Sequence, residues 1–343
     1  MHPKIEKDMD SILVTGASGF IGSFIVEEAL RKGYTTWAAI RKSSSRQYLQ
    51  NPAIHFIELD YTHPDILQKQ LKEHVSKHGA FTYIVHCAGV TKCADKKDFD
   101  RINFQQTKNF VEALIAADLV PKLFVFISTL SVFGPIHEKD YQPITEQDKP
   151  QPNTAYGKSK LKTELFLENL TNFPYLILRP TGVYGPREKD YFMMAKSIQQ
   201  HIDFSVGFKR QDITFVYVKD VVQAIFLGIE KGISQRAFLL SDGKVYQSRT
   251  FSNLIIRELK ASKVLRICAP LWVLKIVSIL SEQWAKLRHT TSTLNTDKYR
   301  IMKQRNWRCD ITPAVNELGY APQYQLDKGV KETIAWYKEE GWL

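Results

Sequence analysis

The amino-acid sequence predicts an α/β fold, a doubly wound parallel sheet with a smaller C-terminal region. Short runs of β-branched and aromatic residues alternate with amphipathic segments from Ser11 to about Ser128, and these runs are apolar on both faces. Strands that are buried on both faces and separated by helices form parallel sheets with both sides covered. These two observations together indicate the fold class.

Seven runs are predicted strands of this sheet: residues 11–15, 35–40, 54–59, 82–86, 123–128, 175–179 and 237–241. The helical segment after the first strand is expected to end at Gly33, because glycine adopts the left-handed conformation that closes many helices. A second helical pattern covers residues 104–120 and stops before Pro121. Residues 1–10 are charged, lack the apolar core of an export signal and are expected to form a short flexible tail.

The composition is typical of a folded protein, since 44% of the 343 residues are hydrophobic. The four cysteines form no CxxC pair, and the nine histidines show no metal-ligand spacing. We therefore expect reduced thiols, a cytoplasmic location and no bound metal. The longest apolar run, residues 269–280, is too short to span a bilayer and contains Lys275.

The net charge of +11 is concentrated in residues 251–310, which contain twelve Lys and Arg but four Asp and Glu. Such a segment attracts an anionic substrate or anionic lipid headgroups, or it is simply a solvated surface. No nucleic-acid-binding motif accompanies it, so we expect no nucleic-acid partner.

A helix is predicted after Pro270, with one apolar side formed by Val273, Ile276, Val277, Leu280 and Trp284. Packing in the core is the interpretation that the pattern favours. A hydrophobic lid over a substrate is the second, and a helix in peripheral contact with a membrane surface, supported by the neighbouring basic residues, is the third.

A glycine-rich turn follows the first strand directly and reads TGASGFIG, from Thr15 to Gly22. Its glycines permit a tight turn, close approach of the backbone to a pyrophosphate and close packing of the next helix. The N-terminus of that helix offers free N–H groups and a positive dipole to phosphates. A glycine triplet alone is a weak signal, but in this strand–turn–helix context it predicts a dinucleotide site.

The residues after the second strand, Arg41, Lys42 and three serines, bear on the choice of dinucleotide. NAD-selective proteins usually place an acidic residue about twenty positions after the glycine turn, whereas a ribose 2′-phosphate requires cationic donors. Arg41, with Ser43 as a second candidate, therefore predicts NADP, and NAD is the alternative. Asp60, after the third strand, is placed to accept a hydrogen bond from the adenine amino group.

Tyr156 and Lys160 lie four residues apart in NTAYGKSK and therefore share one face of a helix. A phenol must lose about 3 pKa units to be half ionised at neutral pH, and a nearby ammonium acts in this direction. Such a pair is common on exposed helices, so its meaning depends on the motifs around it.

The ordered motifs TGASGFIG, HCAG, FISTLSVFG, YGKSK and LRPTGVYGP give the chain a specific resemblance to a known family. It resembles the extended short-chain dehydrogenases/reductases, which include sugar epimerases and dehydratases, dihydroflavonol reductases and 3β-hydroxysteroid dehydrogenases. The resemblance covers nearly the whole chain and implies a Rossmann-type fold, an NAD(P)-dependent enzyme and a homodimer formed through helices within residues 104–119 and 159–170.

The resemblance also implies roles for individual residues. Tyr156 matches the acid/base and Lys160 its electrostatic partner, while Thr129, with Ser128 as a second candidate, matches the hydroxyl that binds the reacting oxygen. Asn103 matches an asparagine on the helix behind the site. The expected cofactor contacts are Gly16, Ser18, Gly19, Phe20, Ile21, Gly22, Arg41, Asp60, Tyr61, Cys87, Ala88, Gly89, Lys160 and Pro180.

Two departures bear on the substrate. Nucleotide-sugar members resemble one another in an asparagine where this chain has Gly182, and in an arginine where it has Ile213. We therefore favour an NADP(H)-dependent oxidoreductase acting on a largely apolar small molecule. An NAD-dependent nucleotide-sugar epimerase/dehydratase is the alternative, with Arg187, Lys209 and Arg210 as substitute cations. A non-catalytic nucleotide-binding structural or regulatory protein is the second alternative.

The expected domain organisation follows from this division of roles. Residues 11–180, joined again by 215–242, are predicted to form the NAD(P)-binding Rossmann domain. Residues 181–214 and 243–343 are expected to form mainly the substrate-binding region.

Overall fold

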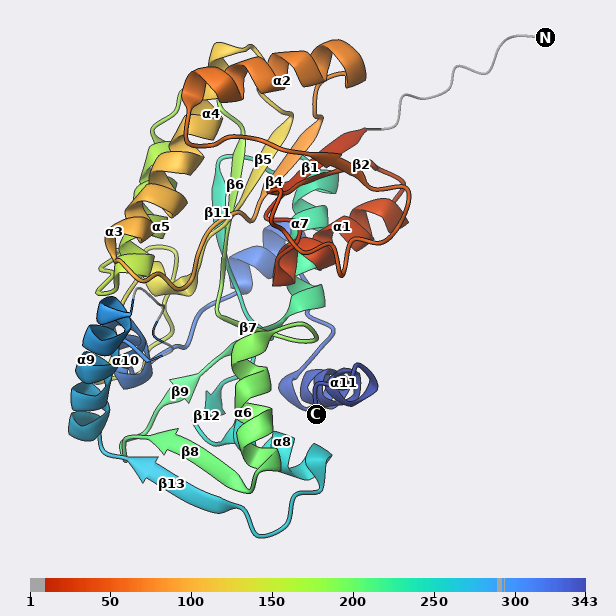
Figure 1. Cartoon of the computed structure of the whole chain (residues 1–343). Helices are drawn as coiled ribbons and strands as arrows, with labels where there is room; N and C mark the ends of the chain where they lie inside the picture. Colours follow the sequence, from red (N-terminus) through yellow and green to blue (C-terminus); the bar gives the residue numbers. More distant parts are fainter. Residues whose placement is uncertain (1–9, 289–291, 293) are drawn as a thin grey trace.

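The computed structural model describes residues 10–288, 292 and 294–343, and its centre is a seven-stranded sheet in the order β11-β6-β5-β4-β1-β2-β3 (Figure 1). All neighbouring strands are parallel. The strands are β1 (Ser11–Thr15), β2 (Thr35–Ala39), β3 (His55–Ile57), β4 (Tyr83–His86), β5 (Leu123–Ile127), β6 (Tyr175–Pro180) and β11 (Arg236–Leu240). All seven predicted strands are confirmed. The predicted tail lies outside the described residues except for Asp10.

Helices cover both faces of this sheet. One face carries α1 (Phe20–Arg31) and α7 (Val218–Lys231), and the other carries α2 (Pro64–His78), α4 (Gln106–Ala116) and α5 (Ala155–Glu168). Alternate residues of β1 point into the two cores, because Ile12 and Val14 pack on the α1 side while Leu13 packs on the α2 side. The predicted doubly wound fold is therefore confirmed.

The order of the strands reverses at β1. Strands β2 and β3 lie on one side of it, and β4, β5, β6 and β11 lie on the other. In doubly wound sheets, ligands bind in the crevice outside the carboxyl ends of the strands at such a point. A short helix α3 (Lys97–Phe99), a π-helical segment (Asp100–Gln105) and a 3₁₀ turn (Leu130–Val132) lie at this end of the sheet.

The remaining elements lie below the carboxyl ends of the strands (Figure 1). They include the two-stranded pairs β7 (Gly182–Tyr184) with β10 (Phe215–Tyr217), β8 (Ile202–Val206) with β13 (Leu265–Ala269), and β9 (Asp212–Ile213) with β12 (Tyr246–Gln247). The helices here are α6 (Lys189–Gln199), α8 (Thr250–Leu259), α9 (Leu271–Leu287), α10 (Thr296–Lys303) and α11 (Leu326–Glu339), and a π-helical turn (Ala314–Leu318) precedes α11.

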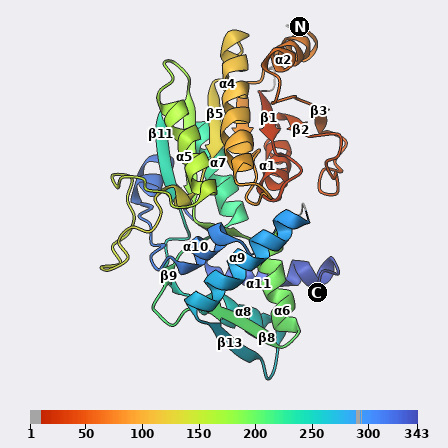
Figure 2. The ribbon, with the colours of Figure 1, turned by 60° about the vertical axis from the view of Figure 1, so that its left-hand side comes forward.

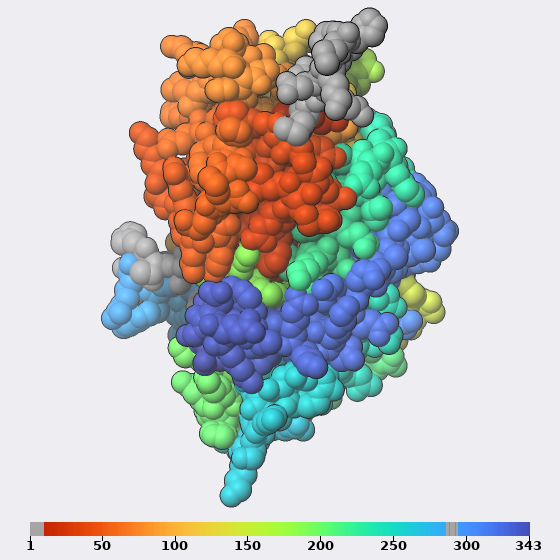
Figure 3. All heavy atoms as spheres, turned by 90° about the vertical axis from the view of Figure 1, so that its right-hand side faces the viewer, coloured from red at the N-terminus to blue at the C-terminus, as the bar shows by residue number. Residues whose placement is uncertain are grey.

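An aromatic core holds this lower part together. Tyr184, Phe215, Phe251 and Tyr337 are buried in one cluster that joins β7, β10, α8 and α11. Figure 3 shows the dark-blue α11 between the red and orange N-terminal half and the cyan and green lower elements. The C-terminal helix therefore closes the molecule on this side.

Helix α9 differs from the favoured expectation. Of the five positions predicted to pack in the core, Ile276, Val277, Leu280 and Trp284 are exposed and Val273 is half-buried, so the core-packing interpretation is wrong. The buried side chains of α9 include Leu274, Ser278 and Ala285, because α9 contacts α10 along this narrow strip. No helix in the described ranges is both long and apolar enough to cross a bilayer.

A buried ion pair joins β6 to α5. The Arg179 guanidinium donates to both carboxylate oxygens of Glu164, with an Nη2–Oε2 distance of 2.8 Å, and both side chains are almost fully buried. Phe133 covers the guanidinium at 5.4 Å from the ring centroid. Since two charges removed from water depend on each other, loss of one partner leaves the other unsolvated.

We expect Glu164→Ala to lower the free energy of unfolding by about 3 kcal/mol, because Arg179 would keep a buried charge with only weaker carboxylate contacts, of which Glu168 lies at 3.8 Å. Urea denaturation of both proteins measures the difference. Glu112→Ala is the control, since Glu112 is exposed and forms a surface pair with Lys108. A change below about 1 kcal/mol at Glu164 would contradict this expectation.

Candidate active site

Two adjoining cavities open at the carboxyl ends of β1, β4, β5 and β6. The larger, the long groove, has a volume of about 640 Å³ and runs from the glycine turn past Tyr156 and Lys160. The smaller, the apolar pocket, has a volume of about 380 Å³ and extends toward α6, α8 and α10. Both are lined by Thr129, Pro180, Thr181, Gly182, Tyr191, Met194 and Lys298. A molecule in the groove would therefore meet a molecule in the pocket at Thr129.

Two glycines of the turn, Gly16 and Gly22, leave no room for a side chain. A Cβ on Gly16, whose φ is +66°, would stand 2.8 Å from the backbone of Cys87, and a Cβ on Gly22 would overlap the carbonyl oxygen of Gly16. Helix α1 begins at Phe20 and Gly19 supplies no side-chain cap, so the first-turn N–H groups point into the groove without a capping side chain. This cradle fits a pyrophosphate.

Behind the groove, hydrogen bonds fix the ends of β4 and η1, the π-helical segment. His86 is held between the hydroxyls of Thr15 and Thr107, both at 2.9 Å, and burial lowers its pKa to about 3, with the charge of Lys160 as a smaller cause. Asn103 donates to and accepts from the backbone of Val90, at 3.0 and 2.8 Å. His86 and Asn103 therefore stabilise the wall of the groove through hydrogen bonds.

Tyr156 and Lys160 lie in the first two turns of α5, which starts after the N-cap Thr154. The Lys160 ammonium is buried, donates to the carbonyl oxygen of Ile127 at 2.8 Å and lies 4.5 Å from the ring centroid of Phe126. Burial lowers the pKa of Lys160 to about 8. Burial also raises the pKa of Tyr156 to about 12, and a hydrogen bond with Thr129 acts in the opposite direction.

The hydroxyl of Thr129 lies at the junction of the two cavities and accepts from the backbone N–H of Ser131 at 3.2 Å. The neighbouring Ser128 also lines the groove, and its buried hydroxyl has no hydrogen-bond partner in the described part of the chain. Thr129 is therefore oriented by the backbone and hydrogen-bonded to Tyr156, whereas Ser128 is not oriented in this way.

Helix α10 contributes residues that sequence reasoning missed. Lys298 lines both cavities and forms an ion pair of 3.0 Å with Asp190. Asp297 accepts from the backbone N–H of Ala155 at 2.6 Å, and Arg300 donates to the carbonyl oxygen of Asn153 at 2.7 Å. The segment that precedes Tyr156 is thus fixed by a helix about 140 residues away in the chain, for which no local sequence signal exists.

The apolar pocket is lined mainly by hydrophobic side chains, namely Leu130, Met194, Phe204, Val206, Ile213, Phe215, Phe251, Ile301, Met302 and Trp307. A Cβ on Gly182 would stand 2.8 Å from the phenol oxygen of Tyr191. Tyr191 thus occupies the space that a side chain at position 182 would need. Among the described residues that line this pocket, Lys298 is the one with an acidic or basic side chain.

The residues predicted as substitute phosphate-binding cations, Arg187, Lys209 and Arg210, lie outside both cavities. Arg187 donates to Ser23 at 2.9 Å and Glu27 at 2.6 Å, and its guanidinium lies over the ring of Phe24. Arg210 forms a two-pronged pair with Asp212, at 2.6 and 2.7 Å. Neither residue, nor Lys209, lines the groove or the pocket.

Of the predicted site residues, the groove brings together Gly16, Gly19, Phe20, Ile21, Gly22, Cys87, Gly89, Thr129, Tyr156, Lys160 and Pro180. Ser18, Arg41, Asp60, Tyr61, Ala88 and Asn103 do not line it. Asp60 bonds within its own turn, accepting from Thr62 at 2.8 Å and lying 2.9 Å from His63, and these contacts, His63 first, lower its pKa. The groove also contains Val90, Thr91, Glu188 and Asp190, which sequence reasoning did not select.

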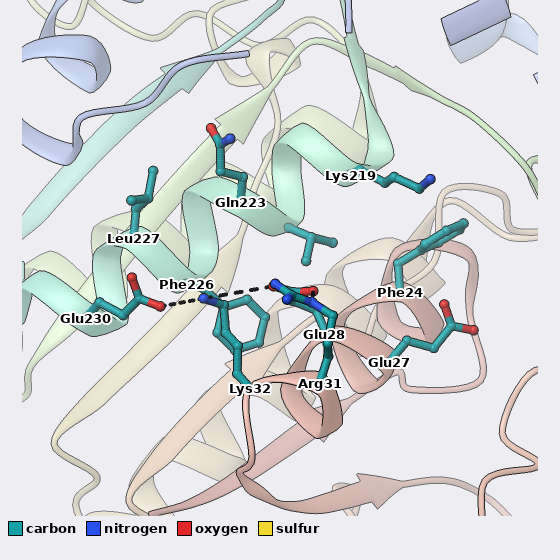
Figure 4. Close-up of a pocket in the computed structure, with 11 residues that line it drawn as sticks. Phe24, Glu27, Glu28, Arg31, Lys32, Lys219, Gln223, Phe226, Leu227 and Glu230 are labelled. Carbon is teal, nitrogen blue, oxygen red and sulfur yellow. Dashed lines mark hydrogen bonds and ion pairs between the residues drawn. The ribbon is translucent and has the colours of Figure 1, made fainter. Parts of the chain in front are cut away.

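A separate groove lies between α1 and α7 and contains none of these residues (Figure 4). Its charged side chains are paired with one another or with neighbours: Lys32 contacts Glu230 at 2.6 Å, and Arg31 contacts Glu28 at 2.6 Å. It is therefore a groove between two helices in which ion pairs neutralise the charged side chains.

The pH dependence of stability should reveal the buried Lys160. The pKa of Lys160 is about 8 in the folded protein, below the ordinary value of 10.5. The buried ammonium therefore lowers the free energy of unfolding by its full amount below pH 8, and this destabilisation disappears as the pH rises toward 10.5. Between about pH 7 and about pH 9.5, the stability difference between wild type and Lys160→Met should shift by about 2 kcal/mol in favour of wild type. Urea denaturation at both pH values measures it.

Lys162→Met provides the matched control, because Lys162 lies exposed on the same helix. A difference between wild type and Lys160→Met that does not change with pH would contradict the lowered pKa.

Comparisons with known proteins agree with this geometry. Residues 12–240 match the model of the NAD dependent epimerase/dehydratase family. The sterol-4-alpha-carboxylate 3-dehydrogenase, decarboxylating, of Dictyostelium discoideum is 23% identical over 94% of this chain and 100% of its own. The UDP-glucose 4-epimerase of Vibrio cholerae is 25% identical over 94% of each chain.

A solved structure shows the same fold. The dTDP-glucose 4,6-dehydratase of Bacillus anthracis, in complex with NAD, superposes with a TM-score of 0.76 at 20% identity, over 97% of this chain and 98% of that one. The matched model, residues 12–240, spans the sheet from Ile12 on, the glycine turn and the segments that contain Thr129, Tyr156 and Lys160. The chain belongs to the NAD dependent epimerase/dehydratase family and is an NAD(P)-dependent enzyme of the extended short-chain dehydrogenase/reductase type.

Proposed function

We propose that the protein is an NADP(H)-dependent oxidoreductase that interconverts a hydroxyl and a carbonyl on a largely apolar small molecule. The observation that carries this proposal is the apolar pocket, which meets the groove at Thr129 and is lined by hydrophobic side chains with Lys298 as its charged group. Burial of an apolar substrate in such a pocket is favourable, whereas a diphosphate would require cations there.

In this proposal, residues 181–214 and 243–343 supply most of the substrate-binding region, and the pocket walls from α6, β8, α8 and α10 support it. The cytoplasmic location and the homodimer through α4 and α5 stay predictions.

Three side chains would act on the reacting oxygen. Thr129 hydrogen-bonds it, and Tyr156 donates or accepts the proton. Burial keeps the phenol protonated at neutral pH, which suits a proton donor in the direction of carbonyl reduction. Lys160 holds the groove wall through Ile127 and supplies positive charge that favours the phenolate once proton transfer begins.

The dinucleotide would lie along the groove. Gly16, Gly19 and Gly22, with the free N–H groups of α1, would hold its pyrophosphate, and Cys87, Gly89 and Pro180 would line its path. When bound, the nicotinamide supplies or accepts the hydride. Asn103 would act as a positioning residue through Val90, at 2.8 Å from its backbone N–H.

A nucleotide-sugar epimerase or dehydratase is the second candidate. It is supported by similarity to the UDP-glucose 4-epimerase of Vibrio cholerae. Two residues argue against it. Gly182 has no side chain, and the Tyr191 phenol occupies the space beside it. Ile213 carries no charge that could bind a phosphate. A non-catalytic nucleotide-binding role is the third candidate, and the intact Thr129, Tyr156 and Lys160 set argues against it.

Turnover assays separate these three functions. Wild type is expected to change NADPH absorbance with lipophilic ketones and not with UDP- or dTDP-sugars. Tyr156→Phe should lower kcat on the order of 10²- to 10⁴-fold with little effect on NADPH binding, because the general acid is lost. Tyr141→Phe, at a half-buried tyrosine outside the groove, should retain full activity.

Conversion of a nucleotide sugar without net change in the cofactor would assign the epimerase function instead. Binding of NADPH without turnover of either substrate class would favour the non-catalytic role.

The choice of dinucleotide depends on Arg41 in this proposal. Its backbone N–H donates to the Ser44 hydroxyl at 3.0 Å, which shapes the turn after β2, and its side chain is exposed. Arg41→Asp should weaken NADPH binding by more than about tenfold and leave NADH binding equal or stronger, because a carboxylate repels a 2′-phosphate and accepts from a 2′-hydroxyl.

Titration calorimetry with both cofactors measures this preference. Lys122→Asp, which has the same charge change at the far end of the sheet, is the control. Tighter binding of NADH than NADPH by wild type would contradict the NADP assignment.

A further inference from the structure

The outer face of α9 is apolar and uncovered. Its exposed hydrophobic side chains are Trp272, Ile276, Val277, Ile279, Leu280 and Trp284, here called the α9 face, and Trp272, Leu280 and Trp284 are 67%, 63% and 60% exposed. Figure 2 shows α9 on the outside of the molecule, in front of α10. Such a cluster of large apolar side chains on one helix indicates an interaction surface.

The fold does not need this face. The opposite side of α9 packs against the rest of the protein, and Leu274, Ser278 and Ala285 are buried there. A hydrogen bond of 2.7 Å joins the hydroxyls of Ser281 and Ser292 on this side. The carboxylate of Glu282 accepts from the backbone N–H of Thr296 at 3.0 Å on this packed side. The two faces of α9 are therefore divided between internal packing and solvent.

The strand pair β8–β13 carries further exposed apolar side chains. Phe204 pairs in register with Ile267, and Leu265 lies two residues before it on the same face, and all three are exposed. The buried Asp203 lies on the other face of the pair. β13 leads into α9 through Pro270, and Phe204 also lines the apolar pocket.

Among the described residues, the exposed charged side chains on α9, on β13 and directly beside them are basic. Lys275 on α9 and Arg288, the residue after α9, are exposed, and the guanidinium of Arg288 lies 4.6 Å from the ring centroid of Trp284. Lys263 and Arg266 are exposed beside Leu265. The acidic residue of α9, Glu282, is bound on the packed side. Basic flanks around an apolar face complement an anionic lipid surface rather than a neutral protein surface.

We propose that the α9 face docks the protein on the surface of an anionic lipid bilayer, with α9 lying in the plane of the headgroups. Its two tryptophans, twelve residues apart, are the side chains that prefer this interface. The exposed lysine and arginines hold the phosphate headgroups. In this orientation Phe204 faces the same lipid surface, so a lipophilic substrate would enter the pocket from the bilayer; this last step rests on the proposed function.

Vesicle flotation with the full-length protein tests the docking without any turnover. Wild type is expected to float with phosphatidylcholine vesicles that contain about 30% phosphatidylserine and to remain behind with phosphatidylcholine alone. Added salt should weaken this binding, because it screens the basic flank. The double variant Ile276→Asp/Leu280→Asp should bind more than about tenfold more weakly, since it places two charges in the apolar contact.

The matched control is Ile66→Asp/Val315→Asp, which makes the same charge change at two exposed apolar residues outside α9. It should float like wild type. Thermal melting checks that both double variants are folded. A further variant, Trp272→Phe/Trp284→Phe, should lose the blue shift of tryptophan emission that vesicles induce in wild type.

Three results would overturn the proposal: wild type that does not bind the anionic vesicles, equal binding by the Ile276→Asp/Leu280→Asp variant, or equal binding to both kinds of vesicle. Light scattering adds a further test. A wild-type dimer that this variant alone converts to a monomer, without vesicle binding, would assign the face to a second copy of the chain. Vesicle binding by a protein that turns over nucleotide sugars only would retain the docking and reject the proposed substrate class.

Discussion

The position of the first turn of α5 is the constraint on which the candidate site depends. Gly157 lies so close to the sheet edge that a Cβ would stand 2.6 Å from the carbonyl oxygen of Ser131. A side chain here would move α5 away from the strand ends, and Tyr156 and Lys160 would move with it. The Thr154 cap, which accepts from the Gly157 N–H at 3.0 Å, fixes the start of the helix at this contact.

Burial at this position sets the protonation of the pair. The same exclusion of water that lowers the pKa of Lys160 raises that of Tyr156, because each group loses hydration of its charged form. Without a ligand the pair therefore contains less charge than it would in water. Groups whose pKa values depend on burial in a cleft are typical of catalytic sites, and a bound charge would shift both of them.

How much the sequence predicts depends on whether a signal is local. The strands and the glycine turn were predictable because periodicity and glycine spacing are properties of adjacent residues. Lys298 and Asp297 were not, because α10 reaches the site through the tertiary fold. The pattern of α9 correctly indicated an apolar side, but periodicity is the same for a side that faces a core and for one that faces solvent, so exposure of Leu280 required the structure.

Helix α10 connects the two surfaces of greatest functional interest. On one side it packs against α9, and on the other Asp297 and Arg300 hold the backbone that leads into Tyr156. Lys298, between them in the sequence, reaches the junction of groove and pocket. The same helix therefore supports an outward apolar face and the segment that leads into Tyr156. In the proposed orientation, a substrate that partitions into lipid would meet both, since Phe204 is exposed, lines the pocket and lies on the strand pair whose second strand leads into α9.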